Sequence, residues 1–271
     1  MKKIYLAALT LAMTACVSNE DLNPVDNYGY IDVNVSNDPV MVTRAEQTVS
    51  ETDLSSWTIT ATNTEKQELI YDLKESNVVP AGIYKIEVSS HSSMEAANKA
   101  GEGKLGAPYY TCETSVEGSS YNGQTDVNKH VTVIAGRTST PTIYCGSAKN
   151  TRIKLDNQLN QGLSEGTFSN VSLNAAAVDG RPAVTLSHGN TAYYKPSTTI
   201  VYSISYTYGG SSKQITDLQI QTGDAATEKI ITLISNSSGQ ITVTISVNDQ
   251  FEPSVENLTF DAATGEQVTN Q

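Results

Sequence analysis

The chain has 271 residues, a formal net charge of −12 at pH 7 and three cysteines. A surface this acidic repels a phosphate backbone, so nucleic acid is not an expected partner. The length allows one large domain or two of ordinary size. After residue 15, no apolar run approaches the roughly 20 residues that a membrane-spanning helix needs, so no such helix is expected.

Residues 1–15 have the composition of a secretory signal peptide. Two lysines follow the first Met, and residues 4–15 form an apolar run that two threonines interrupt. Small residues then precede Cys16, as in bacterial lipoprotein signals, whose cysteine carries diacylglycerol. We therefore expect a cleaved signal at 1–15 and lipidation of Cys16, with an ordinary buried cysteine as the alternative. Each buried methylene of an acyl chain contributes about 0.8 kcal/mol, and two or more chains anchor a protein stably.

Residues 16–27 predict a solvated, acidic tether, because they have little to bury and carry three acidic side chains. An acidic stretch after a lipidated cysteine also resembles the surface-export signal of Bacteroidetes lipoproteins, and a plain spacer is the alternative. The expected location is the cell outer membrane, on its exposed side, with the lipid as the contact to the membrane.

Short strand patterns fill residues 28–149. Residues 30–35 alternate apolar and polar side chains from Ile31 on, which predicts a half-buried strand. A turn at Pro80 and Gly82 precedes another alternating strand that ends at Val88. Residues 92–103 differ, because their pattern allows one or two helical turns before two glycines end them.

A second block, residues 150–271, repeats this character with longer strands. Residues 200–208 form its longest run, and residues 241–247 alternate without a break. Asp179-Gly180 and Gly209-Gly210 are typical hairpin turns. Many short strands with closely spaced turn signals favour a sandwich. We predict an all-β chain with two tandem β-sandwich domains, at 28–149 and 150–271, joined near residues 146–151.

Catalytic and metal-binding patterns are weak. His91, His130 and His188 have no ligand spacing to one another or to a cysteine or carboxylate cluster. The chain contains no glycine-rich phosphate loop that opens a helix after a strand. We therefore expect no enzyme activity, no cofactor and no metal, although a triad assembled from distant residues is a further alternative.

Two cysteines remain after Cys16. Cys112 and Cys145 each lie in a strand-like run, and an exported protein can form disulfides. A bridge between them would contribute about 3–4 kcal/mol in the chain-entropy interpretation. Two buried free thiols are the alternative, since a free cysteine packs as a small hydrophobe.

Paired tyrosines are the weak candidates for a glycan-binding platform: Tyr109 with Tyr110, and Tyr193 with Tyr194. Aromatic faces can stack on sugar rings. The competing and preferred interpretation is that strands favour tyrosine and that one member of each pair faces the core.

Several short motifs together resemble one family. They are the stretch from Gly29 to Val35, the Val42-Thr43-Arg44-Ala45 segment, the run from Val79 to Ile86, the Ala107-Pro108-Tyr109-Tyr110 segment and the Ile143-Tyr144-Cys145 segment. This set resembles fimbrillin-like surface lipoproteins of Bacteroidetes, a family of unknown function related to fimbrial subunits. The resemblance is closer in the first block than in the second. It implies two Greek-key, transthyretin-like β-sandwiches.

The resemblance also implies a mechanism of assembly. In fimbrillin-like subunits a trypsin-like protease cuts after an arginine near the end of the first strand, and a strand of another subunit fills the groove that opens. Arg44, followed by Ala45, matches the cleavage position, with 30–35 as the displaced strand and 258–271 as the candidate donor. The alternatives are that Arg44 is an ordinary loop residue in an uncleaved accessory subunit, or that the chain is a surface glycan-binding lipoprotein.

Overall fold

The computed structural model describes residues 27–36, 57–121, 124–163, 167–247, 250–251 and 257–268. The predicted signal, Cys16 and the Arg44–Ala45 pair lie outside these residues. The described chain is almost entirely β structure, with one short helix, α2 (Met94–Asn98), and a 3-10 turn, η4 (Glu102–Lys104). The predicted all-β class is therefore confirmed, whereas the Greek-key connectivity stays a prediction.

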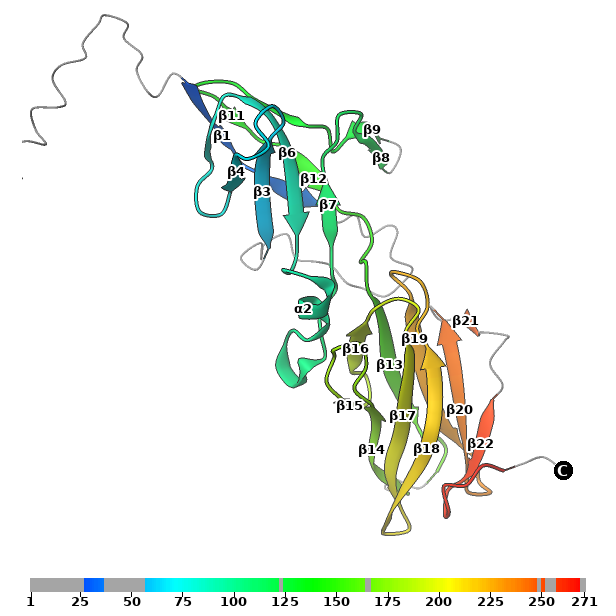
Figure 1. Ribbon diagram of the computed structural model, residues 1–271. Coiled ribbons are helices and arrows are strands. Elements are labelled where there is room, and N and C mark those ends of the chain that lie inside the picture. Colours follow the sequence, from blue (N-terminus) through cyan, green and yellow to red (C-terminus); the bar gives the residue numbers. More distant parts are fainter. Residues whose placement is uncertain are drawn as a thin grey trace, which may run out of the picture.

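Twelve short strands are described in the first part of the chain (Figure 1). They are β1 (Tyr28–Ile31), β2 (Asn34–Ser36), β3 (Thr58–Asn63), β4 (Ile70–Asp72), β5 (Val78–Pro80), β6 (Gly82–Ser89), β7 (Thr111–Glu113), β8 (Ser119–Tyr121), β9 (Gln124–Val127), β10 (Val131–Val133), β11 (Thr138–Ser139) and β12 (Thr142–Tyr144). One sheet has the order β10-β6-β3-β4, with β7 also paired to β6. The orders β11-β1-β5 and β12-β2 form two smaller sheets, and β8 pairs with β9.

The core of this first part lies where the alternation of apolar residues places it. Strand β6 buries Tyr84, Ile86 and Val88 while the residues between them face outward. This follows from the two-residue period of a strand. The cluster consists of Ile31, Trp57, Ile59, Ala61, Val79, Tyr84, Ile86, Val88, Tyr110, Val131, Val133, Ile143 and Cys145.

Longer strands build the second part: β13 (Thr151–Gln158), β14 (Phe168–Ala175), β15 (Val184–Leu186), β16 (Thr191–Tyr194), β17 (Thr199–Tyr208), β18 (Ser211–Gln221), β19 (Glu228–Ser235), β20 (Gln240–Val247), β21 (Gln250–Phe251) and β22 (Leu258–Asp261). One sheet has the order β16-β13-β19-β20, with β21 and β22 both paired to β20. The other has the order β15-β14-β17-β18. Inward residues of both sheets, among them Leu155, Ile204 and Ile231, form one hydrophobic cluster.

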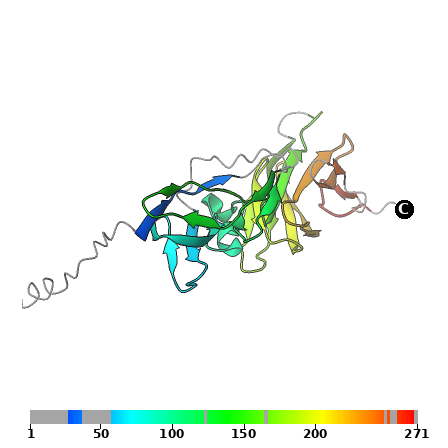
Figure 2. The same ribbon diagram turned by 90° about the horizontal axis from the view of Figure 1, so that it is seen from above.

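The two hydrophobic clusters share no residue, and the two parts lie end to end in an elongated molecule (Figure 2). Helix α2 lies within the stretch that predicted helical turns, and the Ser93 side chain caps it by accepting from the Ala96 N–H at 3.1 Å. The loop that follows α2 reaches the second part, where Leu105 packs against the second cluster. The boundary near 146–151, as a division between independently folding domains, stays a prediction.

Candidate functional site

One strand-like run near the N-terminus contributes a strand to each of the two smaller sheets of the first part, β11-β1-β5 and β12-β2. Residues 28–36, called here the inserted segment, lie parallel to residues 137–145. In this ladder the N–H groups of Tyr30, Asp32 and Asn34 donate to the oxygens of Arg137, Ser139 and Pro141, each at 2.9 Å. The Cys145 N–H donates in the other direction, to the Ser36 oxygen at 3.1 Å. The ladder therefore continues across the gap between β1 and β2.

The opposite edge of the inserted segment is also occupied. Strand β1 pairs antiparallel with β5, and the Ile31 N–H donates to the Asn77 oxygen at 2.9 Å. A side-chain bond closes the same edge, from Asn77 Nδ2 to Asp32 Oδ1 at 2.7 Å. In the part of the chain that the structure describes, β5, β11 and β12 pair with no strand other than this segment. It is therefore the shared partner of all three.

The inward face of the inserted segment closes the first hydrophobic core. Ile31 is 1% exposed, and Val33 and Val35 pack against the same cluster. Gly29 allows a close approach, because a Cβ there would lie 2.5 Å from the Ile134 oxygen and 2.6 Å from Val133 Cγ1. Removing the segment would expose an apolar groove and leave unpaired backbone edges on the strands beside it.

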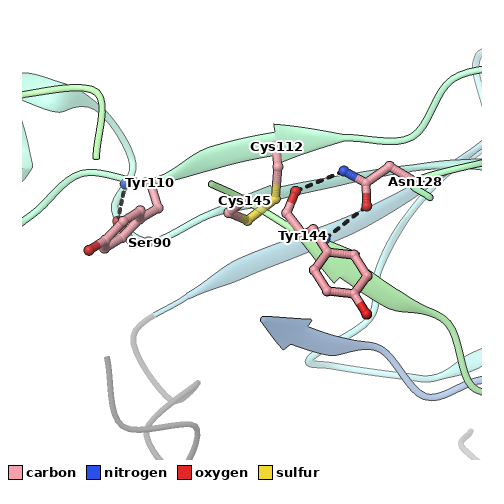
Figure 3. Close-up of a disulfide and its surroundings, with 6 residues drawn as sticks. All are labelled: Ser90, Tyr110, Cys112, Asn128, Tyr144 and Cys145. Carbon is pink, nitrogen blue, oxygen red and sulfur yellow. Dashed lines mark hydrogen bonds between the residues drawn. A yellow bond between two sulfur atoms is a disulfide. The ribbon is translucent and has the colours of Figure 1, made fainter. Parts of the chain in front are cut away.

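Strand β12 has a different kind of partner on its other edge (Figure 3). The Asn128 side chain donates from Nδ2 to the Tyr144 oxygen and accepts from the Tyr144 N–H at Oδ1, both at 2.8 Å. The next residue, Cys145, is joined by a disulfide to Cys112 of β7. Patterning of the sequence pointed to the two cysteines but missed Asn128, because an isolated asparagine has no distinctive spacing.

A cleft of about 660 Å³ borders this disulfide. Its lining includes both half-cystines, Tyr109 and the outward side chains of Glu87 and Glu113. Lys85 forms an ion pair with Glu113 and another with Glu87, the latter at 3.1 Å. These carboxylates, Glu113 first, raise the pKa of the Lys85 ammonium.

The four candidate tyrosines do not share an exposed surface. Tyr110, Tyr193 and Tyr194 are 3%, 6% and 1% exposed, and only Tyr109 of the four lines the cleft. Tyr110 stacks on Trp57 with ring centroids 5.9 Å apart, and burial raises its pKa. Tyr193 and Tyr194 are both buried, although strand alternation directs the two side chains to opposite faces. The loop after α2 packs on the Tyr193 side, where a Cβ added at Gly106 would lie 3.0 Å from Tyr193 Cβ, and the Tyr193 N–H donates to the Leu105 oxygen at 2.9 Å.

A buried arginine holds that loop in place. The Arg181 guanidinium is over the Tyr194 ring, 4.3 Å from its centroid, and burial lowers its pKa. It donates to the backbone oxygens of Asn98, Tyr193, Lys104 and Leu105 at 2.8–3.1 Å. Asn150 adds a second tie, donating from Nδ2 to Asn98 Oδ1 and to the Ala107 oxygen at 2.8 Å. Neither residue was singled out in the sequence, because the partners of both are groups on distant elements.

The C-terminal stretch that the resemblance implied as a donor is paired within its own chain. Strand β22 is antiparallel to β20, with Phe260 opposite Ile241 and only 4% exposed. The Ala262 N–H donates to the Gly239 oxygen at 2.8 Å. A donor role for residues 258–271 would therefore require this strand to leave its sheet first.

The histidines are separated in the fold as they are in the sequence. His91 is next to Ser90, with Nδ1 at 3.1 Å from Oγ, and burial lowers the pKa of its imidazole. His188 faces Asp156, with Nδ1 at 3.6 Å from Oδ1. Among the described residues, no group of three or more histidine, cysteine or acidic side chains gathers as a metal site, and no helix there is long and apolar enough to cross a membrane.

Comparison with known proteins finds no matching family model and no matching curated protein. The chain is similar to solved structures of two candidate cell adhesion proteins, each at 10% identity and TM-score 0.40. The match to the protein from Bacteroides ovatus ATCC 8483 covers 83% of this chain and 98% of that one. The match to the protein from Bacteroides fragilis NCTC 9343 covers 84% of this chain and 100% of that one. It is also similar to the tip fimbrial protein Mfa3 of Porphyromonas gingivalis, at 8% identity and TM-score 0.36, covering 82% of this chain and 98% of that one.

Proposed function

We propose that this protein is a lipid-anchored structural or adhesive component of the cell surface, of the fimbrial type, and that subunits join by strand donation. Lipidation at Cys16 would fix the precursor to the outer membrane. A cut after Arg44 would then free the inserted segment, and a strand from another subunit would take its place. This role requires other subunits as partners and requires no catalysis, cofactor or metal.

The observation that supports the proposal is the pairing of the inserted segment. It is the shared strand partner of β5, β11 and β12 in the described chain, and Ile31 closes the core beneath it. Its loss therefore produces an apolar groove flanked by unpaired backbone groups on both sides. Such a groove favours an incoming strand, because main-chain hydrogen bonds supply affinity and side-chain pockets select the residues that alternate.

The chemistry of a suitable donor follows from the register. A replacement strand has to run parallel to residues 137–145 and antiparallel to β5. It has to place apolar side chains two residues apart, as Ile31, Val33 and Val35 are placed. Glycan binding is not our preferred function, because three of the four candidate tyrosines are buried.

The test is limited trypsin treatment of the mature chain, with Arg44→Gln as the matched control. We expect one early cut, a new N-terminus at Ala45 and a folded product, and the same N-terminus on the protein taken from intact cells. Arg44→Gln should prevent the cut and the formation of multimers. Resistance of Arg44, unfolding on cleavage, or a cell-surface protein that still begins at lipidated Cys16 would contradict assembly by strand donation.

A further inference from the structure

We propose that the Cys112–Cys145 disulfide and the Asn128 carboxamide form a clasp that keeps β12 in place after the inserted segment has left. The clasp would hold one wall of the acceptor groove between the departure of one strand and the arrival of the next. This inference rests on the proposed function. It adds to that function the residues that keep the acceptor groove in shape while the groove is empty.

The backbone of β12 presents alternate residues to its two edges. Groups of Pro141 and Cys145 bond to the inserted segment. The N–H and C=O of Tyr144, in between, bond instead to the Asn128 carboxamide, with both distances at 2.8 Å. Asn128 thus supplies the donor and acceptor pair that a neighbouring strand would supply, and it does so on the edge that the inserted segment does not touch.

The disulfide ties the same end of β12 to β7, a strand of the larger sheet. Cys112 lies in β7, opposite Val88 of β6. Strand β6 also pairs with β3 and β10 in the larger sheet. None of these four strands pairs with the inserted segment, so its departure leaves this attachment intact.

Asn128 is itself held in position by the backbone. Its φ of 55° is in the left-handed region, which asparagine tolerates better than most residues. Its carbonyl oxygen accepts from the Ser115 N–H at 2.9 Å, and the His130 N–H donates to the Ser115 oxygen at the same distance. The carboxamide is therefore aimed at Tyr144 by a local bridge that involves no residue of the inserted segment.

The clasp also restricts how a new strand can bind. An edge with free N–H and C=O groups can pair with any passing strand. Asn128 already bonds to the outer groups of Tyr144, and the disulfide joins the next residue, Cys145, to Cys112 of β7. A donor can therefore pair with this end of β12 only on the edge that β2 occupies.

The experiment measures rebinding of a strand to an emptied groove. A recognition sequence for a site-specific protease is inserted after Arg44 in the mature full-length chain, so that the cut does not depend on native processing. After cleavage and removal of the N-terminal fragment, a synthetic peptide of residues 27–36 is titrated in by calorimetry. The parent is compared with Asn128→Gly and with a Cys112→Ser, Cys145→Ser double variant.

Asn128→Gly removes the carboxamide without strain, because glycine accepts the left-handed conformation. Its matched control is Asn170→Gly, since Asn170 also has a left-handed φ, of 52°, and loses only a bond to Thr207 Oγ1 in the second part of the chain. We expect the peptide to bind Asn128→Gly about tenfold more weakly, because the one or two hydrogen bonds that hold β12 in place are lost and binding then has to order this strand. The double serine variant should also bind the peptide more weakly, and Asn170→Gly should bind it like the parent.

A general stabilising effect of the disulfide would act on the uncleaved chain equally, because it arises largely in the unfolded state. The clasp predicts instead that the double variant loses more stability after removal of the fragment than before it. Equal peptide affinities in all variants would overturn the proposal, as would a parent that unfolds once the fragment is gone. If the double variant does not fold, Asn128→Gly still decides. The two proposals can fail separately. If Arg44 is not cut on cells but the clasp variants still bind the peptide more weakly, the proposed assembly is refuted and the clasp is supported.

Discussion

Single residues determine how closely the inserted segment is held. Gly29 lies against the backbone of residues 133–137, where any side chain would collide. The collision involves main-chain atoms, which cannot rotate away as a flexible side chain can. Gly29 is therefore required for the close approach of β1 to its neighbours rather than for a special backbone conformation.

Gly29→Ala should destabilise the protein by about 1–3 kcal/mol, the usual cost of overpacking. The added Cβ would lie 2.5 Å from the Ile134 oxygen and 3.0 Å from the Arg137 oxygen. Gly82→Ala is the control, because its added Cβ would meet only side-chain atoms, Asn63 Nδ2 at 3.0 Å and the Tyr84 ring at 3.7 Å. Denaturant unfolding of both variants checks this, and equal midpoints for the two would show that Gly29 is not the closer contact.

For single residues, the sequence predicted which side chains pack in a core. It did not predict which side chains form hydrogen bonds to the backbone of distant elements. Cys112 and Cys145 were identifiable as a pair because few cysteines compete. Asn128 and Arg181 were not, because their partners are backbone groups on other elements. Such contacts depend on tertiary approach, which leaves no periodic pattern in the chain.

Strands were the most predictable elements, and their partners the least. Residues 30–35 were predicted as one strand, and the structure has β1 and β2 there with a continuous ladder across the gap. Period-two alternation shows which face is buried, but it contains no information about the neighbour. The parallel partner at 137–145 lies more than 100 residues away in the chain, so only the folded structure shows it.

Strand β22 provides a prediction about an element. Ending the chain after residue 257 should lower the stability of the second part by about 3–5 kcal/mol, the range for losing a buried aromatic residue. The reason is that Phe260 and Ala262 are 4% and 0% exposed in that core. Thermal unfolding measures the loss. Thr259→Ala, at a half-buried position of the same strand, should change stability by less than about 1 kcal/mol.

An unchanged melting temperature in the truncated chain would show that residues 258–271 are a spare tail, free to serve as a donor. A large loss of stability would mean that β22 is required in its own sheet. The donor strand would then be another segment, or β22 of a chain that first releases it.

For the whole molecule, the two hydrophobic cores are joined by polar contacts rather than by a third core. Arg181 and Asn150 bond to backbone oxygens of the loop after α2. These bonds are buried or partly buried, so breaking one would leave an unpaired carbonyl group, at a cost of up to about 1–3 kcal/mol where the group is buried. They resist bending between the two parts.

The whole-molecule prediction concerns attachment. Cys16→Ala should move the chain that has not been cut after Arg44 from the membrane fraction to the soluble fraction, or leave its signal peptide unprocessed, because the acyl chains are the proposed contact of the precursor with the membrane. Fractionation with radiolabelled palmitate measures both outcomes, and Cys112→Ser is the control for a general effect of cysteine loss. Unchanged fractionation of Cys16→Ala would end the assignment of a lipid anchor.

The parallel ladder of the inserted segment has a mechanical consequence. A chain tethered through its N-terminus is pulled at residue 27, directly before β1. A pull along the inserted segment would load the hydrogen bonds to β5, β11 and β12 together, in shear, instead of opening them one by one. The segment that assembly would remove is thus the first to carry the pulling force. An uncut subunit would resist that force, whereas a cut subunit could exchange the segment for a donor strand.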